Sequence, residues 1–308
     1  MNHQTGPARS DHDVRQPADV RPPAEAQPPA DAPQPVFRTD LGTLYRADCL
    51  DVMRGMPSGS VDLVFADPPF NLGKLYGQHF TDAMAEAEYT SWSRAWIKEG
   101  ARLLGPGGAF FLYNIPKWNM RNGAYLQDLG MDFRHWITID IKLSLPIQGK
   151  LYPSHYSLLY FTNGRPRTFT RPRVPVQVCR HCGKDIKDYG GHRDKLHPDG
   201  INLTDVWNDI PPVRHQGTKN RQANELSEKL LERVLDIASE PGDLVFDPFG
   251  GSGTTYAVAE RMHRRWSGAE LGDVEPIVNR LTGVGNQVEL PGLGDAAKGR
   301  RKQPTARA

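Results

Sequence analysis

The sequence has few cysteines and no long apolar run. It holds three cysteines in 308 residues, which are too few for a disulfide framework and favour a reducing interior as the setting. No unbroken apolar stretch reaches about 18 residues, the length that a membrane span requires. The N-terminus also lacks the apolar core of a signal peptide. These absences predict a cytoplasmic protein with no membrane partner.

A strong charge of one sign is also missing. The formal net charge is only +2, from 38 Lys and Arg against 36 Asp and Glu. The whole molecule is therefore not a polycation, and any surface for nucleic acid must come from local clusters of basic residues. The length is sufficient for one large domain or two ordinary ones.

Large apolar residues are almost absent at the two ends of the chain. Residues 1–36 are rich in Pro, Ala, Asp and Arg. Such a composition cannot bury enough surface to offset its ordering entropy, so this segment is expected to be a disordered tail. Residues 286–308 are expected to form a flexible basic tail. The folded part should begin near Phe37.

Between the tails, short apolar runs alternate with stretches of helical periodicity, which is typical of an α/β fold. Strands are expected at 44–46, 61–66, 109–113, 133–143, 156–161, 244–246 and 266–269. Helices are expected at 50–56, 85–104, 118–129, 225–240 and 254–264. Trp92, Trp96 and Leu103 recur at near-helical spacing and should face the core. The loop at 71–80 should be long and mobile.

The strand at 61–66 ends in an unusual tetrapeptide, Asp67–Phe70. Its two prolines, Pro68 and Pro69, stop the strand pairing because proline donates no N–H and has a fixed φ. One carboxylate and one ring are thereby held at the carboxyl end of a strand, where open α/β sheets bind ligands. The arrangement suits a flat group that donates hydrogen bonds, although an ordinary turn also favours Asp and Pro.

A second strand, at 244–246, also ends in an acid and a proline, and glycines follow it. Glycines let the backbone approach a ligand and turn tightly into a helix N-terminus. Glu270 ends the next strand, where an acid binds a ribose diol in nucleotide-binding units. Tyr256 occupies the third glycine position of the dinucleotide pattern, and no G-x-x-x-x-G-K-[ST] is present. A nucleoside cofactor without phosphates, such as S-adenosylmethionine, fits better, and a structural glycine turn is the alternative.

A basic segment separates the two motifs. From Asn163 to Lys195 there are nine Lys or Arg against three Asp, and prolines and glycines interrupt any helical period. We interpret residues 163–215 as an inserted module whose basic side chains contact phosphates. An ordinary solvated loop is the alternative. The candidate DNA-binding residues are Arg165, Arg167, Arg171, Arg173 and Lys184.

The same module carries a set of residues typical of a metal site, Cys179, Cys182, His192 and His197. Two thiolates and two imidazoles could hold Zn²⁺ tetrahedrally, although the nine-residue middle gap is shorter than in zinc fingers. Zinc would be structural, because the module is too irregular to have a core of its own. The alternative is two thiols and two histidines on a basic loop.

The two strand-end motifs together resemble the DNA methyltransferases that modify exocyclic amino groups. Asp67–Phe70 matches their catalytic tetrapeptide, Asp/Asn/Ser-Pro-Pro-aromatic, and Phe249–Gly253 matches their Phe-x-Gly-x-Gly cofactor motif. The catalytic motif precedes the cofactor motif, an order that resembles the beta arrangement, a circular permutation of the fold. The resemblance runs from about Thr43 to Leu271.

The resemblance implies a permuted, Rossmann-like fold of the S-adenosylmethionine-dependent methyltransferases, α/β with a mixed sheet and an inserted basic target-recognition segment. A catalytic half at 37–162, the insert at 163–215 and a cofactor-binding half at 216–285 would make up the folded chain.

The resemblance also implies roles for single residues. Asp67 and the Pro68 carbonyl would accept hydrogen bonds from the target amino group, and Phe70 would stack on a base flipped out of the duplex. Lys219 is the weakest match, because Asn220 follows it where the family has proline. The implied catalytic residues are Asp67, Pro68, Pro69 and Phe70. The implied cofactor-binding residues are Asp48, Cys49, Asp67, Lys219, Asp247, Phe249, Gly250, Gly251, Ser252, Gly253, Thr254 and Glu270.

The implied activity is methyl transfer from S-adenosylmethionine to an amino group in double-stranded DNA. Adenine N6 is favoured over cytosine N4, because Asp at the first position is commoner in adenine enzymes of the family. Action on RNA or on a protein glutamine is the second hypothesis. A catalytically silent DNA-binding module is the third, and the intact Asp67 and Glu270 argue against it. The resemblance leaves open a homodimer, a restriction endonuclease partner and the DNA sequence recognised.

Overall fold

The computed structural model describes residues 33–73, 75–76, 80–140, 148–149, 151, 153–176, 178–179, 182, 184, 190–191, 195–210 and 225–283. Its strands are β1 Pro35–Arg38, β2 Gly42–Tyr45, β3 Val61–Ala66, β4 Leu75–Tyr76, β5 Phe80–Thr81, β6 Leu104–Asn114, β7 Asp132–Asp140, β8 His155–Thr162, β9 Arg173–Val174, β10 Ile201–Asn202, β11 Val206–Trp207, β12 Leu244–Asp247 and β13 Arg265–Ala269. The helices are α1 Cys49–Gly55, α2 Glu86–Leu103, α3 Pro116–Asp128, α4 Glu228–Ala238, α5 Thr254–Arg261 and α6 Glu275–Gly283.

One nine-stranded sheet organises these elements, in the order β1-β2-β13-β12-β3-β6-β8-β7-β11. From β2 to β6 each strand is parallel to its neighbour. By contrast, β1 is antiparallel to β2, and β8 is antiparallel to both β6 and β7. The mixed sheet that the sequence predicts is therefore confirmed.

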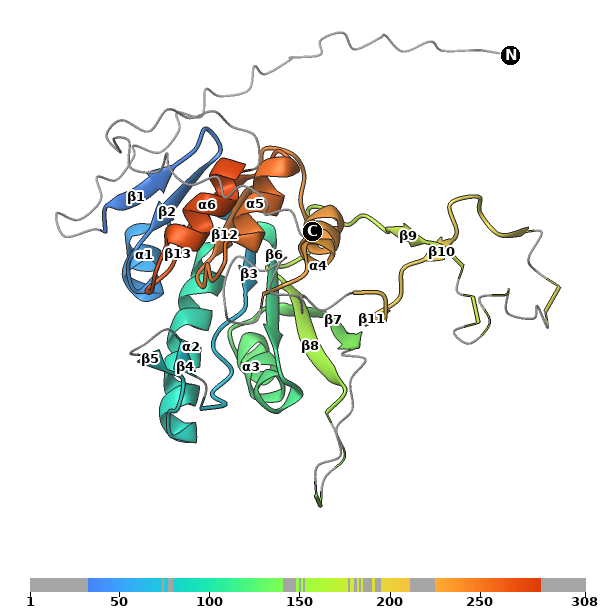
Figure 1. Ribbon diagram of the computed structural model, residues 1–308, viewed down its shortest axis with the longest axis horizontal. Helices are drawn as coiled ribbons and strands as arrows, with labels where there is room; N and C mark the ends of the chain where they lie inside the picture. The colour runs from blue at the N-terminus through green and yellow to red at the C-terminus, as the bar shows by residue number, and fades with distance from the viewer. Residues whose placement is uncertain are drawn as a thin grey trace, which may run out of the picture.

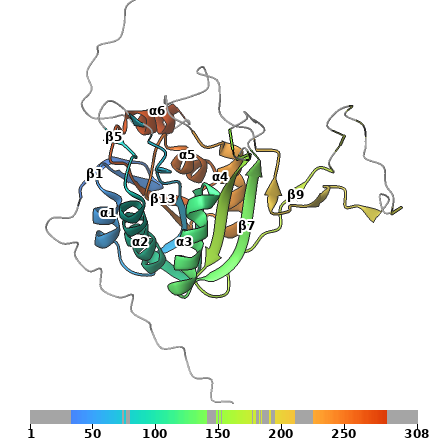
Figure 2. The same ribbon diagram turned by 90° about the horizontal axis from the view of Figure 1, so that it is seen from below.

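Helices cover both faces of the sheet, with α1, α2 and α3 on one face and α4, α5 and α6 on the other (Figures 1 and 2). Alternate residues of β3 serve the two cores, since Phe65 packs with the α4–α6 face and Val64 with the α1–α3 face. A strand that is buried on both faces reads as an apolar run, which explains why 61–66 was recognisable from sequence. Trp96 and Leu103 are fully buried, as predicted, and Trp92 is partly buried against the same core.

Several elements differ from those predicted. The strand β1 begins at Pro35, so the ordered chain reaches into the segment predicted as a tail. Residues 105–108, which precede the strand predicted at 109–113, lie within β6 because Asn163 pairs with them through its backbone and its side chain. The helix α6 was not anticipated, and it buries Ile277 and Leu281. Residues 1–32 and 284–308, which hold most of both predicted tails, lie outside the described residues.

The insert leaves the body of the molecule as a ribbon and returns to it. Its β9 and β10 pair antiparallel and project beyond the sheet (Figure 1). On the return, β11 adds to the sheet beside β7. Arg233 of α4 then fixes this end through two hydrogen bonds to Asp209, at 3.0 and 2.9 Å. No helix in the described part of the chain is both long and apolar enough to cross a membrane.

Candidate active site

Polar side chains line the carboxyl edge of the parallel strands. Because five neighbouring strands run in the same direction, their ends meet at one edge of the sheet. From β2 to β6 the row at this edge is Asp48, Glu270, Asp247, Asp67 and Asn114. Four of these five residues were predicted as site residues, and the topology brings them to one edge.

The tetrapeptide Asp67–Phe70 leaves β3 at the middle of this row. Pro68 is buried, whereas the other three residues are half-buried. The Phe70 ring lies 6.1 Å from the ring of Tyr113 and 5.6 Å from that of Tyr156. Burial, with a smaller contribution from the nearby Asp67 carboxylate, raises the pKa of Tyr113 well above its usual value, so its hydroxyl stays protonated. The acid and the ring of the tetrapeptide therefore lie next to two tyrosines, Tyr113 and Tyr156.

Hydrogen bonds between Asn71 and Met84 join the two ends of the segment that follows the tetrapeptide. Asn71, at φ 55°, donates from its side-chain amide to the Met84 carbonyl at 3.0 Å. It also accepts from the Met84 N–H at 2.7 Å. A further bond joins the Leu72 N–H to Asp82 at 3.2 Å. Between these anchors β4 and β5 pair as a short ribbon, so the loop predicted at 71–80 is partly ordered in its described residues.

The glycine loop after β12 is packed too tightly for side chains at two of its glycines. A methyl group at Gly250 would lie 2.7 Å from Tyr256 Oη, and one at Gly253 would lie 2.8 Å from Ile277 Cγ2. Gly253 has φ 77°, a conformation that favours glycine. The Tyr256 hydroxyl donates to the Asp247 carbonyl at 3.0 Å. Tyr256, at the third glycine position of the dinucleotide pattern, thus supports this loop from inside the core.

Two carboxylates hold the glycine loop in place. Asp247 is buried and accepts from the Phe249 N–H at 2.9 Å. Burial, and to a smaller extent the nearby Glu270 charge, raise the pKa of Asp247 to about 7. Glu270 accepts from the N–H groups of Gly251 and Gly272, both at 2.8 Å. Each Glu270 oxygen has further acceptor capacity, which suits a ribose diol.

Asp48 lies at the far end of the row and caps α1. Its carboxylate accepts from the Leu50 N–H at 2.8 Å. Beside it, Cys49 is buried, and burial raises the pKa of its thiol to about 12. Cys49 is therefore a neutral apolar group here. Asp48 stays a candidate for contact with the adenine of the cofactor. It lies near Glu270, because β2 and β13 end side by side at Tyr45 and Ala269.

Those basic residues of the insert that the structure describes lie on more than one surface. Arg167 pairs with Asp62 at 3.0 Å and with Asp243 at 2.5 Å. These acids stand at the amino ends of β3 and β12, which is the edge opposite to Asp67. Arg165 lies close by, since its carbonyl would be 2.8 Å from a methyl group at Gly107. The predicted DNA contact of Arg167 thus competes with two ion pairs that join the insert to the sheet.

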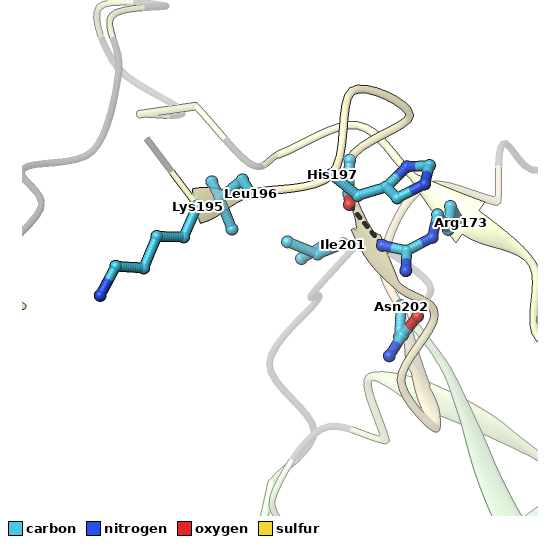
Figure 3. A pocket seen from close by; sticks show the side chains of 7 residues that line it. Arg173, Lys195, Leu196, His197, Ile201 and Asn202 are labelled. Carbon is cyan, nitrogen blue, oxygen red and sulfur yellow. Dashed lines mark hydrogen bonds between the residues drawn. The ribbon is translucent and has the colours of Figure 1, made fainter. Parts of the chain in front are cut away.

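Arg173 belongs to a different surface, an open pocket of about 490 Å³ at the projecting ribbon (Figure 3). Its guanidinium donates to the Gly200 carbonyl at 2.9 Å. Lys195 and His197 add two more nitrogen-bearing side chains to the lining. DNA contact by Arg171, Arg173 and Lys184, all exposed, stays a prediction.

The predicted zinc ligands are only partly described. Cys179, Cys182 and His197 lie in the described residues, whereas His192 lies outside them, as does Lys219. No group of three or more His, Cys, Asp or Glu that could hold a metal ion occurs among the described residues. The structure therefore gives no support to zinc binding, which stays a prediction.

Sequence reasoning missed three residues that hold the Asp67–Phe70 tetrapeptide. Tyr89 donates to the Pro69 carbonyl at 2.6 Å, and Trp118 donates to the Phe70 carbonyl at 2.8 Å. Asn114 in turn donates to the Tyr89 hydroxyl at 3.2 Å. Nothing in the sequence distinguishes these side chains from ordinary core residues, because the contacts depend on how α2 and α3 pack.

Comparison with known proteins identifies the family of this chain. The family model described as DNA methylase (N6_N4_Mtase) matches residues 61–275, which include both strand-end loops. This chain belongs to the DNA methylase family. The methylase is 51% identical over 260 residues to the type II methyltransferase M.BamHI of Bacillus amyloliquefaciens, covering 84% of this chain and 61% of that protein. It is 30% identical over 236 residues to M.HpaI of Haemophilus parainfluenzae, covering 73% and 68%.

Solved structures confirm the fold of this DNA methylase. The PvuII DNA methyltransferase, described as cytosine-N4-specific, superposes with a TM-score of 0.59 at 21% identity, over 83% of this chain and 91% of that one. The M1.HpyAVI–SAM complex superposes with a TM-score of 0.53 at 17% identity, over 79% and 98%. The predicted methyltransferase fold is therefore confirmed.

Proposed function

We propose that this DNA methylase transfers a methyl group from S-adenosylmethionine to an exocyclic amino group of a base in double-stranded DNA. One observation carries the proposal: β12 pairs directly with β3, through Val245 with Leu63 and Phe246 with Val64. Paired strands lie about 4.8 Å apart. The acidic tetrapeptide and the glycine loop therefore leave the sheet as neighbours, one suited to an acceptor and the other to a donor.

The acceptor side is built to polarise an amino group. Asp67 and the Pro68 carbonyl offer hydrogen-bond acceptors at the strand end, and Phe70 offers a ring for stacking. Accepting the amino protons localises the nitrogen lone pair, which otherwise delocalises into the base, and so makes the nitrogen a nucleophile. The base has to leave the duplex to reach this loop. Positioning does most of the work, and no strong base is required at Asp67.

The donor side fits a nucleoside without phosphates. Gly250 and Gly253 have no room for side chains because Tyr256 and Ile277 pack against them, so the loop backbone is held in a fixed position. Glu270 is oriented by two backbone N–H groups, with acceptor capacity remaining for ribose hydroxyls. Asp48 stands two strands from β12 at the same edge, placed for an adenine ring. When bound, S-adenosylmethionine supplies an electrophilic methyl group.

The test is a methyl-transfer assay with unmethylated duplex DNA and labelled cofactor. Wild-type protein is expected to label DNA, and Asp67→Ala is expected to lose at least about 100-fold in rate, because it removes an acceptor from the reacting group. Asp128→Ala is the matched control, since Asp128 is exposed at the end of α3. Absence of label in DNA with the wild-type protein contradicts the proposal.

Adenine N6 and cytosine N4 are the two candidate target groups, and a separate observation favours each. The Asp at the first position of the tetrapeptide favours adenine N6. Similarity to the cytosine-N4-specific PvuII enzyme favours cytosine N4. Digestion of the labelled DNA to nucleosides distinguishes N6-methyladenine from N4-methylcytosine. Competition by RNA in place of duplex DNA tests the RNA hypothesis in the same assay.

A further inference from the structure

One buried tyrosine of α2 reaches the middle of the catalytic tetrapeptide. Tyr89 is 1% exposed, and its hydroxyl donates to the Pro69 carbonyl at 2.6 Å. The fully buried Asn114, at the end of β6, donates to the oxygen of the same hydroxyl at 3.2 Å. Because the Asn114 amide donates to the Tyr89 oxygen, the Tyr89 hydroxyl proton is available to donate to the Pro69 carbonyl.

A tryptophan of α3 holds the next carbonyl along. Trp118 Nε1 donates to the Phe70 carbonyl at 2.8 Å, and the Trp118 ring lies 4.5 Å from the Tyr89 ring. Lys117 and Arg121 lie over the Trp118 ring, at 4.5 and 5.4 Å from its centre. Both cations pair with Glu86 at the start of α2. Two successive carbonyls of the tetrapeptide are thus held by donors from two helices that are themselves tied together.

The same rings continue to the cofactor side. Trp92 lies 5.5 Å from Tyr89 and 5.7 Å from Phe249, which belongs to the glycine loop. We call the series Trp118, Tyr89, Trp92 and Phe249 the aromatic ladder. Offset and tilted ring contacts at these distances are attractive and hard to compress. The ladder therefore joins the loop predicted to hold the acceptor to the loop predicted to hold the donor.

We propose that Tyr89 is a positioning residue for methyl transfer. By fixing the Pro69 carbonyl it sets the direction of the Pro68 carbonyl and of Asp67 next to it, and through the aromatic ladder it keeps the two loops at a constant separation. In-line transfer requires the reacting atoms within about 3.5 Å, and a displacement of about 1 Å can cost 100-fold in rate. This inference rests on the proposed function, because it assigns Tyr89 a part in that reaction.

The variant Tyr89→Phe tests the proposal, since it keeps the ring in the ladder and removes only the hydroxyl. We expect kcat to fall by about 10-fold to 100-fold. KM for S-adenosylmethionine and KM for DNA should each change by less than about 2-fold, because neither binding surface is touched. The measurement is steady-state methyl transfer, with active sites counted by cofactor binding.

Tyr160→Phe is the matched control. Tyr160 is another buried tyrosine, 1% exposed, and its hydroxyl has no hydrogen-bond partner among the described residues. Removing that hydroxyl should leave kcat at the wild-type value. The proposal is overturned if Tyr89→Phe keeps wild-type kcat, or if its loss is matched by Tyr160→Phe.

Amide hydrogen exchange separates failure of this proposal from failure of the proposed function. Exchange at Phe70, Asn71 and Leu72 should be faster in Tyr89→Phe than in the wild type and unchanged in Tyr160→Phe, whether or not methyl transfer occurs. If wild-type protein transfers no methyl group, the proposed function fails, and this exchange still decides whether Tyr89 holds the loop. Equal exchange in Tyr89→Phe and the wild type overturns the positioning role.

Discussion

The loop at Asp67–Phe70 and the loop at Asp247–Gly253 both follow a buried parallel strand, and each begins with an acid and a proline. The first is stiffened by prolines and held by donors from neighbouring helices, Tyr89 and Trp118. The second is folded upon its own backbone, with the Gly253 N–H donating to the Gly250 carbonyl at 2.8 Å.

The acids that begin the two loops, Asp67 and Asp247, differ in burial. Asp67 is half-buried at the strand end, whereas Asp247 is fully enclosed and uses its carboxylate to hold the Phe249 N–H. An acid followed by proline at a strand end therefore does not define a chemical role by itself. Burial decides whether the carboxylate faces a ligand or serves the loop, and the following predictions test this contrast.

The largest effect is expected from the buried acid. Asp ionises near its ordinary pKa of 3.8 in the unfolded chain, whereas the pKa of Asp247 in the folded protein is about 7. As pH rises through this window the unfolded state loses its proton first, so the free energy of unfolding falls, by on the order of 4 kcal/mol in full. Asp247→Asn should remove this fall. The measurement is urea unfolding of both proteins at pH values from about 4 to 8.

A contradictory outcome is equally clear for Asp247. If the wild type and Asp247→Asn change in parallel across the window, the carboxyl is not protonated at neutral pH. The pKa of Asp247 would then be raised less than its buried position indicates, and the difference between the two acids would be smaller.

The next largest effect concerns the packing beneath the glycine loop. A methyl group at Gly268, in β13, would lie 2.0 Å from the Tyr256 hydroxyl and 2.2 Å from its Cζ atom. Because Tyr256 is fully buried and its ring is stacked on Trp266, it cannot move aside. Gly268→Ala should therefore lower the free energy of unfolding by about 3 kcal/mol.

Gly283→Ala provides the matched control for that measurement. Among the described residues, a methyl group at Gly283 would meet nothing within 4 Å, and alanine suits a helix better than glycine. The control should be neutral or slightly stabilising in urea unfolding. A loss in Gly268→Ala no larger than in the control would show that the glycine loop is loosely supported.

The sequence predicts seven of the nine strands of the main sheet and both strand-end motifs, because each of these is a local pattern. Adjacent residues alone are enough to interpret three patterns: the apolar run 61–66, the two prolines after Asp67 and the glycines after Asp247. The resemblance to a known family then predicts the permuted α/β fold that contains both motifs.

The remaining features depend on contacts between distant segments. Arg167 has the same charge as Arg173, but only the fold shows that Asp62 and Asp243 lie within reach of Arg167. Tyr89 is similar in sequence to any core residue of α2, and its hydrogen bond to Pro69 exists only because α2 packs beside the Asp67–Phe70 loop. A single sequence contains no signal for such pairs.

The smallest effect concerns two tyrosine hydroxyls, each of which donates to a carbonyl of one loop, and this allows a direct comparison. Tyr256→Phe removes the hydrogen bond to the Asp247 carbonyl and keeps the ring on Trp266. We expect a loss of about 1 kcal/mol in the free energy of unfolding, with kcat close to the wild-type value. Tyr89→Phe makes the same chemical change on the other loop, but there the expected effect is on kcat. If both variants lose stability and neither loses kcat, the loop at Asp67–Phe70 is held no differently from the glycine loop. The contrast between the two loops then fails.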